Sequence, residues 1–387
     1  MKSRRIAVVG AGMAAARLAQ QLEAHAGPTE TALYGAEPEP PYNRALLTDV
    51  LTGRYCADGL ALPTGDAKVR TGTEVVAVDV RGRALTLADG SRETYDELVL
   101  ATGAEPVLPG HTEGAHTLRS LADCARISRH ADTATRAVVI GGGVLGVGAA
   151  RALAARGLPV NIVHEGPHLV DRHLDSEAGA ALRTALGRLG VTVRLASTLD
   201  GGVRRTSADL VVITCGVRPR TALARAAGLP VRRGIVVDDT LACAPHTYAI
   251  GDCAEHRAAP YALATTAWEQ ADVLAARLSG ADPGARYTGS RPMTRLTAGP
   301  VEYAAFGACG NAAEEGADVL RIGDATRGSY KKLVLRGNRI VGAILVGDLA
   351  TAGTLTRAYL TGRPVGPDPL SLLTAPLSVR ATEESRP

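Results

Sequence analysis

The chain has 387 residues, and at roughly 100 to 200 residues per domain this length predicts two or three domains and excludes a single small module. Hydrophobic residues make up 46% and charged residues 21%, as in ordinary globular proteins, and the net charge of +4 is spread along the chain without a basic block. With 3% aromatic residues and no apolar run near the ~20 residues that span a bilayer, we expect neither a nucleic-acid partner nor a membrane partner.

The six cysteines lie far apart, and none has CxxC, CxxxxC or CxxH spacing. This pattern argues against a zinc site and against a dithiol redox centre of the usual type. We therefore expect free thiols, a reducing compartment and a cytoplasmic location. The cysteines are Cys56, Cys124, Cys215, Cys243, Cys253 and Cys309.

Near the N-terminus, the apolar run Ile6–Val9 predicts a strand that stops at a G-x-G-x-x-A turn and continues into a helix. In this motif Gly10 permits the tight turn, Gly12 lets the backbone approach a pyrophosphate, and the small Ala15 allows helix and strand to pack closely. The next strand leads to Glu37, which is placed either to bind a ribose or to stay a solvated loop carboxylate.

A second unit of the same kind begins about 130 residues later. The run Ala137–Ile140 predicts a strand, and it ends at the full G-x-G-x-x-G fingerprint of Gly141, Gly143 and Gly146. Its next strand ends at His164 and Glu165. Two dinucleotide sites in one chain favour an electron shuttle in which a flavin and a nicotinamide dinucleotide bind face to face.

Short strands are expected between and after these units. We expect an antiparallel meander between them, and a C-terminal α+β domain after a linker at Asp282–Ala285. The expected strands are Glu74–Asp79, Ala84–Ala88 and Glu97–Ala101 in the meander, and Glu302–Ala308, Val319–Ile322, Lys332–Leu335 and Ile340–Val346 before a last helix near Ala350–Leu360.

Four further motifs make a resemblance specific. They are Pro41–Leu47 (PYNRALL), Ala101–Ala104 (ATGA), Thr214–Pro219 (TCGVRP) and Tyr248–Cys253 (YAIGDC). In this order they resemble the FAD-dependent pyridine nucleotide-disulfide oxidoreductase superfamily, over roughly residues 4 to 280.

Within that superfamily, the Pro-Tyr-Asn-Arg segment and the missing thiols are similar to the ferredoxin, rubredoxin and nitrite reductase branch. Shorter matches resemble the FAD electron-transfer subunits of assimilatory nitrate or nitrite reduction. These matches are Gly35–Pro38, Val163–Glu165, Asp171–Asp175, Trp268–Gln270, Gly347–Leu349 and Gly353–Arg357.

The resemblance implies an α/β fold of the glutathione reductase type, with two Rossmann-like dinucleotide-binding domains and a C-terminal α+β domain. FAD is expected to bind to residues 1–118 and 240–283. NAD(P)H is expected to bind to residues 119–239, and residues 284–387 are expected to form an interface domain in a monomer or homodimer.

The resemblance also assigns cofactor contacts. The Gly10 turn and Arg44 are expected to bind the FAD pyrophosphate. Val75 is expected to contact the adenine region, and Asp252 the ribityl chain. A helix N-cap is the alternative role for Asp252, and a surface salt bridge is the alternative for Arg44. The remaining expected FAD contacts are Met13, Ala14, Ala101, Thr102, Gly103, Arg119, Gly251 and Trp268. Val144, Leu145 and Gly216 are expected to bind a cofactor together with the second fingerprint.

Two positions depart from the family. Many relatives pair a Lys after the flavin segment with a Glu after the second fingerprint, whereas this chain has Asp49 and Gly148 there. Without that Lys the pair cannot form, so nicotinamide positioning must rely on other contacts or be weaker.

The resulting interpretation is a flavoprotein in which NAD(P)H reduces FAD and the flavin passes single electrons to a separate redox partner. No acid–base catalyst and no metal ligand are assigned. The carboxylate Glu165 favours NADH, while Arg172 keeps NADPH open. The alternatives are a flavoenzyme acting directly on a small molecule, and a non-catalytic redox sensor that has lost turnover.

The expected partner is an acidic carrier, such as a ferredoxin-like protein or a nitrate or nitrite reductase subunit. Basic residues in the C-terminal region predict a docking patch for it, with a solvated face as the alternative. The patch consists of Lys331, Lys332, Arg336, Arg339, Arg357 and Arg363.

Overall fold

The computed structural model describes residues 3–110, 112–198, 208–257, 259–260, 264–291, 293–299 and 301–374. The chain divides into two compact units, which are described separately. The first contains Met1–Glu165 and Gly190–Pro292, and the second contains Gly166–Leu189 and Met293–Pro387. A segment from the middle of the chain therefore belongs to the same unit as the C-terminal region.

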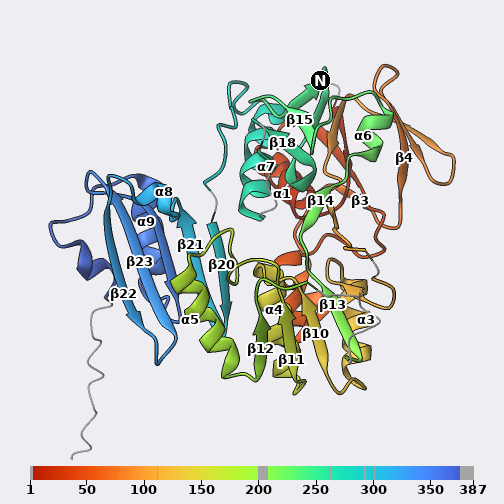
Figure 1. The fold of residues 1–387 in the computed structure, drawn as a ribbon. Coiled ribbons are helices and arrows are strands. Elements are labelled where there is room, and N and C mark those ends of the chain that lie inside the picture. The colour runs from red at the N-terminus through yellow and green to blue at the C-terminus, as the bar shows by residue number, and fades with distance from the viewer. Residues whose placement is uncertain are drawn as a thin grey trace, which may run out of the picture. The chain divides into compact units, whose positions relative to one another are not determined.

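A six-stranded sheet in the first unit is built around the N-terminal strand (Figure 1). Its order is β16-β17-β7-β1-β2-β3, and all neighbours except β16 and β17 run parallel. This order around β1 is that of a Rossmann-type fold, which binds ligands at the carboxyl ends of its strands. The strands are β1 (Arg4–Val9), β2 (Thr29–Tyr34), β3 (Lys68–Arg70), β7 (Glu97–Leu100), β16 (Ala242–Ala244) and β17 (Thr247–Ala249).

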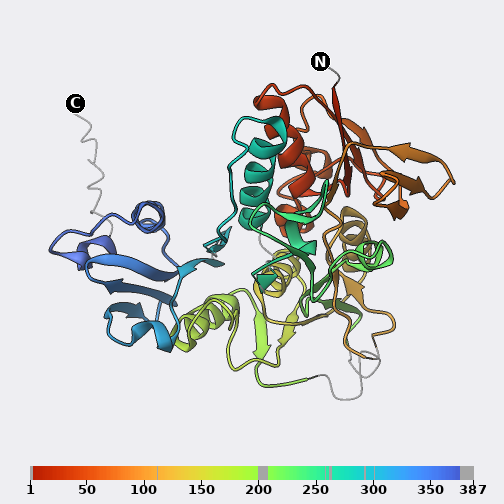
Figure 2. The same ribbon diagram turned by 90° about the horizontal axis from the view of Figure 1, so that it is seen from above.

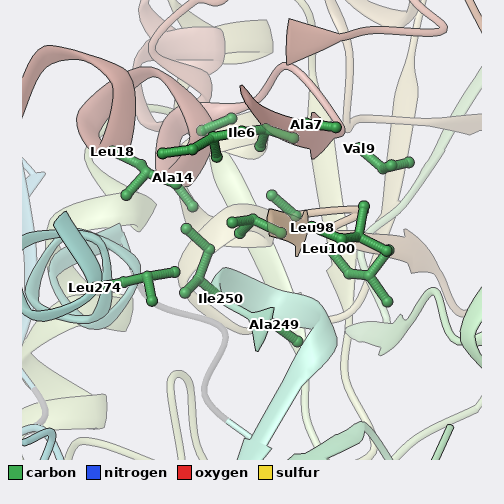
Figure 3. Close-up of a cluster of buried hydrophobic side chains, with 14 of the residues drawn as sticks. Ile6, Ala7, Val9, Ala14, Leu18, Leu98, Leu100, Ala249, Ile250 and Leu274 are labelled. Carbon is green, nitrogen blue, oxygen red and sulfur yellow. The ribbon is translucent and has the colours of Figure 1, made fainter. Parts of the chain in front are cut away.

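The core of this sheet explains the apolar runs of its central strands (Figure 3). Strand β1 pairs with β2 and β7 on its two sides, and its apolar residues Ile6–Val9 are all buried. Leu18 of helix α1 (Met13–Ala24) and Leu274 of helix α7 (Ala264–Ser279) pack into the same core as Leu98. Helices α1 and α7 lie side by side (Figure 1).

The antiparallel meander differs from the expectation in its third strand. It consists of β4 (Val75–Asp79), β5 (Ala84–Leu87) and β6 (Arg92–Thr94). Residues 97–101 were expected there, but β7 lies in the main sheet between β1 and β17. All four residues of β7 are buried, which suits a central parallel strand and not a strand of a solvated meander.

A second, five-stranded parallel sheet in the first unit has the order β12-β11-β10-β13-β9. Its strands are β9 (His116–Thr117), β10 (Ala137–Ile140), β11 (Val160–Val163), β12 (Val191–Arg194) and β13 (Leu210–Ile213), with helices α3 (Leu121–Ala131) and α4 (Val144–Ala155). Smaller elements complete the unit. They are α2 (Leu47–Leu51), α6 (Ala222–Ala226), β8 (Ala104–Pro106), β14 (Val217–Pro219), β15 (Ile235–Val237), β18 (Ala254–His256) and β19 (Ala259–Pro260).

The second unit contains an antiparallel sheet of order β20-β21-β24-β23-β22. The sequence does not predict its edge strand β20, which lacks a clear apolar alternation. The elements are α5 (Ser176–Gly187), β20 (Met293–Ala298), β21 (Val301–Gly307), α8 (Asn311–Glu314), β22 (Asp318–Asp324), β23 (Ser329–Arg336), β24 (Arg339–Val346) and α9 (Ala352–Thr361).

The two faces of strand β23 are covered by different helices. Leu333 and Leu335 form a cluster with Leu355 of helix α9, which lies against one face of the sheet (Figure 2). Lys332 points to the opposite face and contacts the start of α5.

In the part of the chain that the structure describes, no helix has the length and hydropathy needed to cross a membrane.

Candidate functional site

The first glycine turn follows β1 and has the geometry of a pyrophosphate cradle. Gly10 has φ of +108°, and a Cβ atom there would lie 2.1 Å from the carbonyl oxygen of Ala101, so only glycine fits. A Cβ atom on Gly12 would meet no atom within 4 Å, and Gly12 caps helix α1 without a side-chain hydrogen bond. Space and unbonded N–H groups of Met13, Ala14 and Ala15 therefore occur together, as an anion site at a helix N-terminus requires.

Two other predicted segments lie beside this turn. The N–H group of Ala101 donates to the carbonyl oxygen of Val9, which places Ala101, Thr102 and Gly103 directly after β7 and next to the turn. A Cβ atom on Gly251 would approach the Cβ atom of Ala14 to 3.1 Å. The ends of β1, β7 and β17 thus bring the Gly10 turn, the Ala101–Gly103 segment and the Gly251–Asp252 turn to one edge of the sheet.

Four predicted polar side chains form a connected series at this edge. Arg44 forms an ion pair with Glu37 and donates a hydrogen bond of 2.9 Å to the carbonyl oxygen of Arg119. The guanidinium group of Arg119 in turn pairs with the carboxylate of Asp252, at 2.5 Å. The side chains are 17% to 32% exposed, so they remain accessible to a ligand. Asp252 is held by a cation and does not act as a helix cap.

The segment around Glu37 is braced from two sides. Tyr42 donates a hydrogen bond of 2.6 Å to Glu37, and burial raises the pKa of Tyr42, so its hydroxyl remains a donor at neutral pH. The N–H group of Gly72 donates to the carbonyl oxygen of Glu37, which brings the start of β4 alongside. Val75, three residues after Gly72, is buried, and its contact with an adenine stays a prediction.

The second glycine turn repeats the first. Gly141 has φ of +104°, and a Cβ atom there would lie 2.6 Å from the carbonyl oxygen of Thr214. A Cβ atom on Gly146 would lie 1.8 Å from the carbonyl oxygen of Gly141, whereas Gly143 faces open space. Gly143 caps helix α4 without a side-chain bond, so the first helical residues Val144 and Leu145 present free N–H groups.

A short antiparallel ribbon connects two segments that lie beside the two glycine turns. It pairs β8, which follows Gly103, with β14, which follows Gly216. Thr102 donates a hydrogen bond of 2.8 Å to the carbonyl oxygen of Arg220, whose N–H group donates back to Gly103. Gly216 has φ of +95°. The chain segments that leave the strand ends beside the two glycine turns are therefore in direct contact.

The predicted ribose contacts of the second site lie at the end of β11. The N–H group of His164 donates to the carbonyl oxygen of Arg194, and its own carbonyl oxygen accepts from Ser197, so the backbone of His164 is held at both groups. Glu165 is exposed. The pKa of Cys215 is raised mainly by burial and to a smaller extent by the negative charge of Glu165. Glu165 thus lies near Cys215, the residue before Gly216.

Helix α7 contains a residue that sequence reasoning missed. Gln270 is completely buried, and its side-chain oxygen accepts a hydrogen bond of 2.7 Å from the N–H group of Gly251. The predicted Trp268 is half-buried on the same helix. The sequence gives no signal for this contact, because Gln270 and Gly251 lie on separate segments that meet only in the folded chain.

At Asp49 and Gly148, where many relatives have a Lys–Glu pair, the structure has a different ion pair. Asp49 of α2 forms a buried ion pair with Arg151 of α4, at 3.2 Å. A Cβ atom on Gly148 would lie 3.0 Å from the methyl group of Thr48. The family's pair is absent, but an ion pair of another kind joins the same two helices.

The structure gives no support for thiol chemistry. All six cysteines are free. Burial raises the pKa of Cys124, Cys243 and Cys309 to about 12, and it also raises that of the fully buried Cys253. Among the described residues, no cluster of three or more histidine, cysteine or acidic side chains is arranged to hold a metal ion.

The predicted docking patch needs a correction. Lys331 and Lys332 are 7% and 1% exposed, and they pair with Asp348 and Asp175 respectively. Neither can meet a partner, because each ammonium group is enclosed by acceptors of its own unit. Arg336, Arg339, Arg357 and Arg363 are exposed as expected.

Comparison with known proteins identifies the family of both parts of the chain. Residues 4–271 match the family model of pyridine nucleotide-disulphide oxidoreductases. Residues 292–360 match that of the rubredoxin NAD+ reductase C-terminal domain.

Curated relatives include the nitrite reductase [NAD(P)H] of Bacillus subtilis, which is 36% identical over 92% of this chain and 47% of the relative. The assimilatory nitrate reductase electron transfer subunit of the same organism is 31% identical over 94% of this chain and 50% of the relative. The chain thus spans about half the length of these curated relatives.

Solved structures agree in fold. The putidaredoxin reductase chain of a covalent complex with putidaredoxin has a TM-score of 0.83 and 25% identity, with 95% of both chains covered. The NADH:rubredoxin oxidoreductase of Clostridium acetobutylicum has a TM-score of 0.78 at 24% identity, covering 96% of this chain and 99% of that chain. The expected fold class, of two dinucleotide-binding domains and a C-terminal domain, is confirmed.

The expected resemblance is confirmed as well, together with the enzyme class and the cofactors of the family. The relatives are NAD(P)H oxidoreductases, and the family depends on FAD and NAD(H). This chain belongs to the pyridine nucleotide-disulphide oxidoreductase family and carries a C-terminal domain of the rubredoxin NAD+ reductase type.

Proposed function

We propose that this chain is the FAD-containing electron-transfer part of a reductase and passes electrons from NADH to a separate redox protein. One observation carries the proposal. The β8–β14 ribbon pairs the segment after Gly103, beside the first glycine turn, with the segment after Gly216, beside the second, so two dinucleotides held at these turns would extend toward a common junction. Bound FAD would supply the conversion of a two-electron hydride into single electrons.

The residues of the chain would bind and orient the cofactors. In this proposal residues 1–118 and 240–283 hold FAD, and residues 119–239 hold the nicotinamide dinucleotide. The N–H groups after Gly12 and the guanidinium group of Arg44 would hold the FAD pyrophosphate, and Glu37 would accept from a ribose. Asp252, kept in place by Arg119, would accept hydrogen bonds from the ribityl chain.

The nicotinamide dinucleotide is proposed to be NADH. The exposed carboxylate of Glu165 at the end of β11 suits a free ribose and repels a 2'-phosphate. Arg194, whose carbonyl oxygen accepts from the N–H group of His164, keeps NADPH as the second candidate.

The proposed partner is an acidic redox protein, and nitrate or nitrite reduction is the proposed pathway because of the two Bacillus subtilis relatives. The corrected docking patch consists of four exposed arginines. Arg336 and Arg339 flank the turn between β23 and β24, and the bridge between Arg339 and Pro364 brings Arg363 alongside. Within the described residues, none of the four forms an ion pair with a carboxylate, so the patch carries net positive charge.

Anaerobic mixing with NADH tests the proposal. We expect a yellow protein with one FAD per chain whose flavin is bleached rapidly by NADH. Its electrons should pass to an acidic ferredoxin-like carrier more slowly as salt rises, while flavin reduction by NADH changes little. Protein that cannot be reconstituted with FAD would refute the proposal.

The alternatives give other results in the same experiment. Reduction of a small organic acceptor, with carrier rates insensitive to salt and to Arg336→Glu/Arg339→Glu, would favour a flavoenzyme acting directly on a small molecule. Bound FAD without bleaching would favour a non-catalytic sensor.

A further inference from the structure

Helix α7 supplies a hydrogen-bond acceptor to the backbone at the point where strand β17 ends. The N–H group of Ile250, directly after β17, still donates to the carbonyl oxygen of Leu100 in β7, at 3.0 Å. The next N–H group, that of Gly251, donates instead to the side-chain oxygen Oε1 of Gln270, at 2.7 Å. The backbone hydrogen bonds therefore pass from the sheet to a side chain of α7 at this residue.

This hydrogen bond lies in apolar surroundings. Gln270 is 0% exposed, and the buried face of α7 on which it lies also contains Ala271 and Leu274. Leu274 and Ile250, the residue before Gly251, belong to one hydrophobic core (Figure 3). Gly251 is buried as well. Because a buried N–H group that loses its acceptor cannot turn to water, we expect the turn to shift when the acceptor is removed.

The turn held by Gln270 packs against helix α1 and carries a predicted FAD contact. Gly251 has φ of +75°, and a Cβ atom there would lie 3.1 Å from the Cβ atom of Ala14. Asp252 follows in the same short 3-10 turn, Gly251–Cys253, and forms an ion pair with Arg119. A shift of Gly251 would therefore move the carboxylate of Asp252 relative to the start of α1.

We infer that Gln270 is a positioning residue for FAD, because its hydrogen bond to Gly251 fixes where Asp252 presents its carboxylate to the ribityl chain. This inference rests on the proposed function, which places Asp252 against that chain. Gln270 is itself completely buried, so it acts through the backbone of Gly251 and not by contact with the cofactor. By holding the turn before FAD binds, it lowers the ordering cost of binding.

The other polar atom of the Gln270 side chain separates positioning from general stabilisation. Among the described residues, the buried Nε2 has no hydrogen-bond partner. Burying an unsatisfied amide nitrogen costs free energy, so a glutamine at this place is a poor choice for stability alone. A methionine of similar length would remove that cost together with the acceptor of Gly251. We therefore expect Gln270→Met to keep the stability of the FAD-free protein and to lose affinity for FAD.

Thr266 provides a matched control one turn earlier on α7. It is 1% exposed, and its hydroxyl oxygen has no hydrogen-bond partner in the part of the chain that the structure describes. Thr266→Val removes a buried polar atom from the same helix and leaves the acceptor of Gly251 in place. General weakening of α7 should therefore appear in both variants, and displacement of the turn only in Gln270→Met.

The experiment measures the Kd for FAD by adding FAD to the full-length protein after its flavin has been removed, with flavin fluorescence as the signal. We expect Gln270→Met to raise this Kd by about 10-fold, as loss of one buried hydrogen bond predicts, with the thermal midpoint of the FAD-free protein unchanged. Thr266→Val should bind FAD like the parent protein. In an Asp252→Asn background, Gln270→Met should have little further effect, because both changes act on one contact.

Three results would overturn the inference. The first is an unchanged Kd in Gln270→Met. The second is an equal rise of the Kd in Thr266→Val, and the third is a full 10-fold effect of Gln270→Met in the Asp252→Asn background. If Gln270→Met does not fold, Gln270→Asn, which keeps the amide but withdraws it from Gly251 by one methylene group, decides in the same way. Parent protein that never binds FAD would instead refute the proposed function.

Discussion

Asp49 and Arg151 form a buried ion pair between helices α2 and α4, with 3.2 Å between a carboxylate oxygen and a guanidinium nitrogen. Helix α2 follows the Pro41–Leu47 motif of the first site, and α4 begins at the second fingerprint. Gly148, one helical turn before Arg151, leaves room for Thr48, so α2 approaches α4 closely. The two departures from the family are therefore parts of one contact.

Breaking this pair should cost far more stability than breaking a surface pair. We expect Asp49→Asn and Arg151→Met each to lower the free energy of unfolding by about 3–5 kcal/mol, because each removes one charge of a buried ion pair. The double variant Asp49→Leu/Arg151→Met should lose less than the sum of the single losses. Urea unfolding of all three variants measures this coupling.

The exposed pair of Arg17 and Asp272 is the control, since both of its side chains are more than a third exposed. Asp272→Asn should cost no more than about 1 kcal/mol. Strictly additive losses at Asp49 and Arg151 would show that the two charges do not depend on each other.

The two glycines of the first turn should fail in different ways. Gly10→Ala forces a methyl group into the carbonyl of Ala101 and a strained backbone, so the unit itself should be destabilised. Gly12→Ala meets no protein atom and should fold normally, yet its methyl group fills the space proposed for the pyrophosphate. FAD absorbance per chain and the thermal midpoint of the FAD-free protein separate the effects. A Gly12→Ala protein with full FAD would contradict the cradle.

Thiols should be dispensable for reduction of the flavin by NADH. Because burial raises the pKa of Cys124, Cys243 and Cys309 to about 12, these thiols stay protonated far above neutral pH. A variant with all six cysteines replaced by serine or alanine should keep its NADH-dependent bleaching rate, with the same pH profile between about pH 6 and 9. Loss of rate with flavin retained would point to a cysteine mechanism.

Discrimination between the two nicotinamide dinucleotides should depend on Glu165. We expect kcat/KM for NADH to exceed that for NADPH at least 10-fold, which corresponds to about 1.4 kcal/mol. Glu165→Gln should narrow the ratio by removing the charge that opposes a 2'-phosphate. Glu30→Gln, a change to an exposed carboxylate on β2, should leave it unchanged. A tenfold preference for NADPH in the parent protein would reverse the assignment.

Much of the fold and of the candidate site follows from local patterns in the sequence. The apolar runs ending at Gly10 and Gly141 predict two strand–turn–helix units, and the structure shows why each glycine is needed. These features are readable because a turn and its flanking residues interact over a few positions.

Tertiary structure decided the contacts between distant segments. The alternation of β23 turns Lys331 and Lys332 to opposite faces. No local sequence pattern shows that they pair with Asp348 and Asp175. Likewise β7 looks like a strand of the meander until β1 and β17 enclose it, and Asp49 looks unpaired until α4 brings Arg151 from 102 positions away. A sequence shows which side chains carry charge or apolar surface. Whether that charge is buried, and against which partner, depends on packing between segments far apart in the chain.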